Sequence, residues 1–158
     1  MPFRTSLRPC AFTLWLCLTS LDTRAARELP DPAITPGATN TQVSPSNIDT
    51  TACQKGGSRT VRPPVSYTNR IEHIVMHQYG YDREDIHAFE LDHLIPLSLG
   101  GAPDDPKNLS PEPHVGDGTA DDKDALEAQL HHLVCDCKSP LAEPQSAIRT
   151  NWISAYRR

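Results

Sequence analysis

The segment ELDHLIPLSLGGAPDDPKNL, residues 90–109, constrains the fold of this chain more than any other stretch. It begins as an apolar, strand-like run that contains Asp92 and His93. A Gly-Gly pair and an Asp-Asp-Pro loop then supply turn residues, and the chain returns to Asn108. Burial of an Asp or His side chain without a partner costs several kcal/mol. The segment therefore predicts a hairpin that carries a polar site and does more than pack.

The remaining periodic segments predict a mixed α+β domain. The hairpin strands are expected over 88–97 and 108–113, because Pro96 helps to end the first strand. Three stretches with helical spacing of apolar residues predict helices over 66–80, 119–135 and 143–156. Thr119 can cap the middle helix, and acidic residues follow it in the first turns, where the helix dipole favours negative charge.

The beginning of the chain indicates export. Residues 1–25 combine early arginines, a short apolar core and the small residue Ala25, which is typical of a signal peptide. Residues 26–51 are rich in proline and poor in large apolar groups, so we expect a disordered linker there. The folded domain is then expected over 52–158.

Cysteine usage agrees with a periplasmic or secreted protein. Three cysteines remain after removal of the predicted signal peptide: Cys53, Cys135 and Cys137. In an oxidising compartment we expect Cys53 to form a disulfide with either Cys135 or Cys137, which leaves one thiol.

No apolar run reaches the roughly 18 residues that indicate a membrane-spanning helix. We therefore expect no membrane association of the mature form.

The net charge limits the choice of partner. The chain carries −5 at pH 7, and the predicted signal peptide carries +2, so the mature chain would carry −7. Proteins that bind nucleic acid normally present a basic surface. A bound divalent cation or a local basic patch would be needed to offset this acidity at a nucleic-acid site.

The order of elements resembles a known family. A strand with Asp-His, a loop, an Asn on the return strand and then a helix is similar to the HNH endonucleases of the ββα-metal (His-Me finger) superfamily, and the motif covers roughly 88–135. More loosely, residues 52–158 resemble small exported HNH-type proteins through VRPPVSYT, FELDHLIPLSLGG, NLSPEP, KDALEAQLHHLVC and AIRTNW. The resemblance implies a ββα-metal hairpin-helix core packed with additional helices. It also implies a metal-dependent endonuclease that hydrolyses phosphodiester bonds of nucleic acid, with DNA favoured over RNA.

The chemistry of this reaction assigns roles to the motif. Hydrolysis of a phosphodiester needs a base for the attacking water and a cation for the developing charge. His93 is the candidate base, since imidazole titrates near neutrality. Asp92 offers a hard oxygen ligand for Mg²⁺ or Mn²⁺, with Zn²⁺ as an alternative. Asn108 offers a second oxygen ligand, or it orients the base.

One position departs from the family pattern. Relatives often carry a final His near the start of the helix, and the spacing to Lys123 places Asp121 there. Asp121 is therefore the candidate third metal ligand, with His114 on the preceding loop as a substitute. Glu90 lies two residues before Asp92, so both share one face of the strand. It is either an outer group of the metal site or a plain surface charge.

Basic residues are candidates for substrate contacts. Lys123, Arg62 and Arg70 are expected to contact phosphate, and Tyr67 lies near the two arginines in sequence. A solvated surface position is the alternative for each of them.

Two further groups have the residue types of zinc ligands. The first is a pair of histidines four residues apart, His73 and His77. The second is a cluster at the end of the predicted helix over 119–135, for which a disulfide is the favoured use: His131, His132, Cys135 and Cys137.

A rival hypothesis retains the HNH-like fold but assumes no catalytic activity. The acidic balance and the Asp at position 121 favour a non-catalytic exported module that binds a metal or a protein partner.

Overall fold

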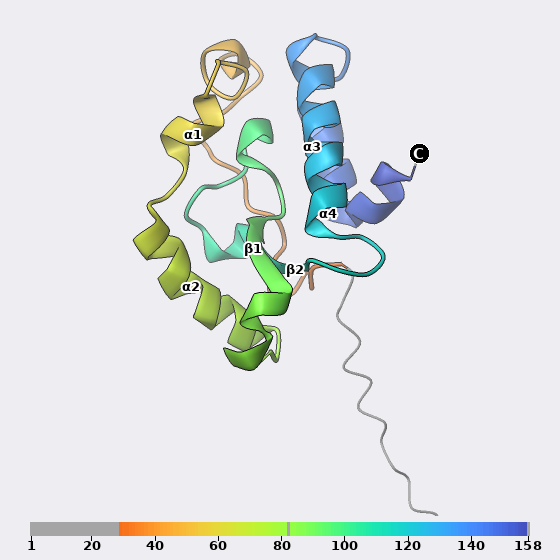
Figure 1. Cartoon of the computed structure of the whole chain (residues 1–158). Helices are drawn as coiled ribbons and strands as arrows, with labels where there is room; N and C mark the ends of the chain where they lie inside the picture. Colours follow the sequence, from red (N-terminus) through yellow and green to blue (C-terminus); the bar gives the residue numbers. More distant parts are fainter. Residues whose placement is uncertain (1–28, 82, 158) are drawn as a thin grey trace, which may run out of the picture.

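The computed structural model describes residues 29–81 and 83–157. The predicted signal peptide, 1–25, lies outside these residues. Two antiparallel strands and four α-helices make up the described chain, which confirms the α+β class. The elements are α1 (Gly57–Val61), α2 (Val65–Gln78), β1 (Phe89–His93), β2 (Leu109–Pro113), α3 (Ala120–Cys135) and α4 (Ala142–Tyr156). Helices α1 and α2 lie on one side of the hairpin, and α3 and α4 lie on the other (Figure 1).

Short 3₁₀ helices shape the connections around the strands. They are η1 (Ile48–Thr50), η2 (Arg83–Ala88), η3 (Leu97–Leu99) and η4 (Pro106–Asn108). Both η3 and η4 belong to the loop between β1 and β2. The loop contains Gly100 at a φ of 74°, a left-handed conformation that glycine adopts readily. The predicted strand over 88–97 therefore ends earlier, at His93, because the chain turns into η3 after Pro96.

Capping residues explain where helix α3 begins. The Thr119 side chain accepts a hydrogen bond from the Asp122 amide, and the Asp122 side chain accepts one from the Thr119 amide. This reciprocal capping box satisfies two amides at the helix start. Helix α4 contains a kink at Asn151, whose side chain accepts a hydrogen bond from the Ser154 amide at 2.8 Å and so caps the second half.

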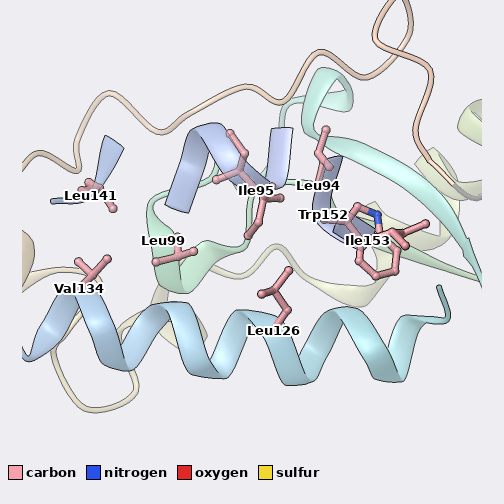
Figure 2. Close-up of a cluster of buried hydrophobic side chains, with 9 residues drawn as sticks. Leu94, Ile95, Leu99, Leu126, Val134, Leu141, Trp152 and Ile153 are labelled. Carbon is pink, nitrogen blue, oxygen red and sulfur yellow. The ribbon is translucent and has the colours of Figure 1, made fainter. Parts of the chain in front are cut away.

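The hydrophobic core lies between the hairpin loop, α3 and α4. Figure 2 shows Leu126 and Val134 of α3 beneath Leu99 of η3, with Trp152 of α4 on the same side of α3. Trp152 is 1% exposed and Leu99 is fully buried. Burial of one such side chain contributes about 1.5–3 kcal/mol. The core therefore fixes α3 against the loop that follows Asp92 and His93.

The segment before η1 packs against the hairpin loop, which differs from the predicted disordered linker over 26–51. The Thr35 hydroxyl is buried and donates to the Leu109 carbonyl at 2.8 Å. Backbone bonds join Asn40 to Gly100, and Thr39 and Gly101 form a β-bridge. The described residues 29–51 are thus a strap on the domain, held by these backbone hydrogen bonds and by Leu29, Val43 and Ile48, which pack against the core.

The disulfide prediction is confirmed as Cys53–Cys135, with Cys137 as an exposed free thiol. The bond ties the strap end to the last turn of α3. Among the described residues, no helix has the length and apolar character needed to cross a bilayer.

Candidate functional site

The hairpin presents a polar face to α3. In the antiparallel register, Glu90 pairs with Glu112 and Asp92 pairs with Ser110. Alternate residues of a strand point to the same side, so these four side chains share one face. Lys123 of α3 contacts both Asp92 and Glu112, which shows that α3 covers this face.

Lys123 forms the centre of the site. Its Nζ lies 2.7 Å from Asp92 Oδ2, 2.8 Å from the His93 carbonyl oxygen and 3.2 Å from Glu112 Oε1. It also donates to Glu127 Oε1, one helical turn further along α3. The Lys123 side chain is 0% exposed. The prediction that Lys123 contacts substrate phosphate is therefore wrong, because its ammonium is enclosed by the protein's own carboxylates.

The acids around Lys123 outnumber its single positive charge. Burial alone would lower the pKa of Lys123, but the carboxylates of Glu112, Asp92 and Glu127 raise it well above its usual value. Burial tends to raise the pKa of Asp92, yet the Lys123 ammonium outweighs this and holds the Asp92 pKa below its usual value. Asp92 and Lys123 are therefore both charged at neutral pH.

Glu112 and Glu127 have the opposite shift from Asp92. Glu112 is 3% exposed; its Oε1 lies within ion-pair distance of Lys123, but neither oxygen has a hydrogen-bond geometry with a donor. Burial raises the pKa of Glu112 well above its usual value, and it raises the pKa of Glu127 to about 7 in spite of Lys123. The cluster thus carries more acid than its ammonium can neutralise.

Three carboxylates at the rim of this cluster converge. Asp92, Asp124 and Glu127 each offer an oxygen, and these oxygens all lie within 4.8 Å of one another. Asp124 and Glu127 are three residues apart on α3, which places them on one face of the helix. The Asp124 side chain is exposed, whereas Asp92 and Glu127 keep 17% and 16% of their side chains exposed. Burial and the nearby Asp92 charge raise the pKa of Asp124.

This rim fits a divalent cation by its chemistry. Carboxylate oxygens are the ligands that Mg²⁺ and Mn²⁺ prefer. The buried Glu112 carboxyl shares Lys123 with Asp92 and Glu127, so the cluster has more carboxylates than ammonium groups, an imbalance that a cation would relieve. Of the predicted metal ligands, Asp92 belongs to this group, whereas Asp121 lies on the exposed surface of α3 outside it.

Asn108 faces the interior of the hairpin loop instead of the rim. Its Oδ1 accepts from the Ile95 amide at 2.9 Å, and its Nδ2 donates to the carbonyls of Ile95 and Ala102 at 2.9 and 3.0 Å. The side chain is fully buried. Gly101 makes room for it, since a Cβ there would overlap the Ile95 carbonyl. This placement favours the role of a brace that orients the base and does not support direct metal binding by Asn108.

The His93 ring is fixed by a single backbone contact. Nε2 lies 2.9 Å from the Pro103 carbonyl oxygen, and Nδ1 lies 3.9 Å from Asp92 Oδ1. A carbonyl only accepts, so Nε2 carries the proton and Nδ1 carries the lone pair of the neutral ring. Burial lowers the pKa of His93, although the Pro103 carbonyl and Asp92 oppose the shift. At neutral pH the ring therefore presents a basic nitrogen beside Asp92.

The predicted basic residues lie on the α1–α2 side of the site. Arg62 is exposed just after α1 and borders the same hollow as Pro103, whose carbonyl contacts His93 Nε2. The Arg70 guanidinium lies over the Tyr67 ring, 5.7 Å from its centroid. Of the two arginines, Arg62 is thus the one next to the loop that holds the candidate base.

The other singled-out residues lie at the margins of the site or elsewhere. Burial raises the pKa of Glu90, as do the charges of Asp92 and Asp124, while His114 lowers it. Glu90 shares a strand face with Asp92, and the exposed His114 lines the same hollow as Glu90.

The two groups with the residue types of zinc ligands lie on other surfaces. His73 and His77 are exposed on α2. His131 Nε2 lies 3.2 Å from the Ala52 carbonyl oxygen, and its ring approaches the disulfide sulfurs of Cys53 and Cys135.

Sequence reasoning missed three acids that complete the cluster: Glu112, Asp124 and Glu127. The available signals were weak. Glu112 follows the strand register, and the i,i+4 spacing of Lys123 and Glu127 is common on solvent-exposed helices.

Comparison of the chain with family models, curated proteins and solved structures gives no match. The resemblance to HNH endonucleases accordingly stays a prediction.

Proposed function

We propose that this protein is an exported, divalent-metal-dependent hydrolase of phosphodiester bonds in nucleic acid, of the HNH endonuclease type. The observation that carries the proposal is the arrangement at the end of β1. There the basic Nδ1 of His93 faces the carboxylate of Asp92, which also belongs to the convergent carboxylate rim. A base beside a cation site is the minimum that metal-assisted hydrolysis requires.

His93 acts as the general base in this proposal. Nδ1 takes a proton from a water molecule, the water oxygen bonds to phosphorus, and the bond from phosphorus to the leaving oxygen breaks. The leaving oxygen then takes a proton from solvent. The Pro103 carbonyl keeps Nε2 protonated, so Nδ1 stays the acceptor in each turnover.

Asp92, Asp124 and Glu127 are the residues that would hold Mg²⁺ or Mn²⁺. When bound, the cation supplies positive charge for the phosphate oxygens and the leaving group. Lys123 supports this set as a positioning residue, because its ammonium fixes Asp92 Oδ2 and keeps Asp92 ionised.

Two observations favour the rival function, a metal-binding module without catalysis. Lys123 already contacts Asp92 Oδ2, so a cation shares this carboxylate with an ammonium. His93 is also only 5% exposed, which limits the access of water to its ring. The module would then bind a cation through the rim and leave nucleic acid intact.

The deciding experiment combines nicking of supercoiled plasmid DNA with calorimetric titration of Mg²⁺ and Mn²⁺. The wild-type protein is expected to nick DNA with either metal. His93→Ala should slow nicking at least about 100-fold, within the range for loss of a general base, and keep the metal affinity. Asp124→Asn should weaken metal binding. The matched control is His73→Ala, which changes an exposed histidine on α2.

The outcomes separate the two functions. Metal binding by a protein that leaves both DNA and RNA intact with Mg²⁺, Mn²⁺ and Zn²⁺ refutes the hydrolase and supports the module. Nicking that persists in His93→Ala refutes the assigned base.

A further inference from the structure

A hollow of about 310 Å³ adjoins the loop that holds the candidate base. Residues of the α1–α2 connection form one wall, and the hairpin loop forms the other; they include Arg62, Pro64, Tyr67 and Pro103. The hollow is at the small end of the range for ligand sites, about 300–1,000 Å³. Pro103 connects it to the chemistry, because its carbonyl is the hydrogen-bond partner of the candidate base. A group bound here would lie beside Pro103, the residue that holds the imidazole.

Arg62 belongs to both the hollow and the candidate site. It lines the hollow together with Pro103, whose carbonyl lies 2.9 Å from His93 Nε2. The carboxylate rim is acidic, so an exposed guanidinium beside it provides a place for an anionic group. Guanidinium groups bind phosphate oxygens through two parallel hydrogen bonds. The position of Arg62 therefore fits a phosphate that lies between the hollow and the rim.

Tyr67 gives the hollow a fixed aromatic ring. Its hydroxyl donates to the Asp104 carbonyl on the opposite wall. The Arg70 guanidinium lies over the ring, 5.7 Å from the centroid. A ring held at two points loses little conformational freedom when a second flat group stacks on it. Nucleobases are such groups, and aromatic side chains bind them with little regard to sequence.

We propose that this hollow binds the nucleobase next to the scissile phosphate, with Tyr67 as the stacking residue and Arg62 as the phosphate contact. The inference rests on the proposed hydrolase function and specifies its substrate as a strand with unpaired bases. A base within a duplex already stacks on its neighbours, so its faces are not free. Prolines in both walls complete an apolar surface for the base.

The test measures binding without cleavage, with the full chain carrying His93→Ala in the presence of Mg²⁺. Fluorescence anisotropy compares a labelled oligothymidylate of about 12 nucleotides, within the range of single-strand site sizes, with an abasic oligomer of equal length. Tyr67→Leu should weaken binding of oligothymidylate about tenfold, as expected for loss of one stacked base, and leave the abasic oligomer unaffected. Tyr67→Phe keeps the ring but loses the hydroxyl bond to Asp104, so it should bind oligothymidylate more tightly than Tyr67→Leu does. Arg62→Gln should weaken both oligomers equally, because both carry phosphates.

The matched control is Tyr156→Leu, which changes an exposed tyrosine at the end of α4 and should alter neither affinity. The inference is overturned if Tyr67→Leu binds oligothymidylate as tightly as the parent protein, or if the parent protein binds neither oligomer. Cleavage of the oligothymidylate by the wild-type protein with Mg²⁺ separates the two proposals. Tyr67-dependent binding without cleavage refutes the hydrolase and keeps the base site, whereas cleavage without Tyr67 dependence refutes the base site alone.

Discussion

Replacement of Lys123 by Met tests whether the ammonium holds the buried acids in place. Methionine keeps an apolar stem of similar length, so the change removes mainly the charge. Asp92, Glu112 and Glu127 would then lose their common partner. Removal of one member of a buried ionic cluster costs about 3–5 kcal/mol, because an uncompensated charge remains. We expect a loss of this size in the free energy of unfolding at about pH 8.

The loss should depend on pH in a defined direction. The pKa values of Glu112 and Glu127 are raised, so at about pH 5 both carboxyls are already neutral in the wild-type protein. Asp92 is then the remaining charged partner of Lys123, and its protonation from the usual pKa of 3.8 costs about 1.4 kcal/mol per pH unit. We therefore expect Lys123→Met to cost no more than about 2 kcal/mol at pH 5.

Urea denaturation, followed by the fluorescence of the buried Trp152, measures both values. EDTA in every sample keeps cation binding from contributing to stability. Lys138→Met is the matched control, since Lys138 forms an exposed pair with Asp136 and its loss should leave the unfolding midpoint unchanged. If Lys123→Met costs less than about 1 kcal/mol at pH 8, the ammonium does not organise the cluster, and our account of the site is wrong.

Three more predictions concern Glu127, the disulfide and Asn108. The pKa of Glu127 is raised to about 7 from 4.5, so the folded state binds the proton more tightly, and its contribution to stability is lost as pH rises from 4.5 to 7. Glu127→Gln should remove about 3 kcal/mol of this pH dependence in metal-free urea titrations; parallel pH profiles of wild type and variant would contradict the shift. Cys53→Ser opens a loop with a sequence separation of 82 residues, for which chain entropy gives a loss of about 4–5 kcal/mol by the same assay; a loss below about 1 kcal/mol would contradict it. Asn108→Ala leaves the buried Ile95 amide without its acceptor and should cost about 2–3 kcal/mol, with metal affinity in calorimetry unchanged; the reverse pattern would make Asn108 a ligand.

The periodic parts of the fold were predictable because their signals are local. Helices over 119–135 and 143–156 match α3 and α4 closely, since capping residues and apolar spacing act within a few residues of the chain. The strap over 29–51 was not predictable in this way. Its order comes from backbone hydrogen bonds to the hairpin loop, such as that of Asn40 with Gly100, and from a few scattered apolar contacts, including that of Val43 with the core; neither leaves a periodic apolar pattern in the sequence.

In the candidate site, too, residues with a local signal were predictable and residues placed by tertiary packing were not. Asp92 and His93 stood out because a strand has no packing use for them. Lys123 was expected at the surface as a phosphate contact, because a helical lysine near acids usually faces solvent. Its direction is set by tertiary packing, where Leu126, three residues later, enters the core and turns the same face of α3 toward the hairpin. Local sequence patterns indicate which residues are unusual for their position, but they do not indicate which residues are in contact in the folded protein.

The buried lysine also bears on how an acidic protein could act on a polyanion. A site made only of carboxylates would repel both the substrate and its own members, and its geometry would depend on the metal. Here the buried ammonium of Lys123 holds the acids together in the absence of metal. The rim of Asp92, Asp124 and Glu127 then offers a separate site for an exchangeable metal cation. Arg62 is the basic residue whose charge reaches this rim from the α1–α2 side. The chain has a net charge of −5, so its surface as a whole does not attract a polyanion. Under the proposed function, a divalent cation and the Arg62 guanidinium supply the positive charge locally. Nucleic-acid binding should therefore require the metal, as cleavage does.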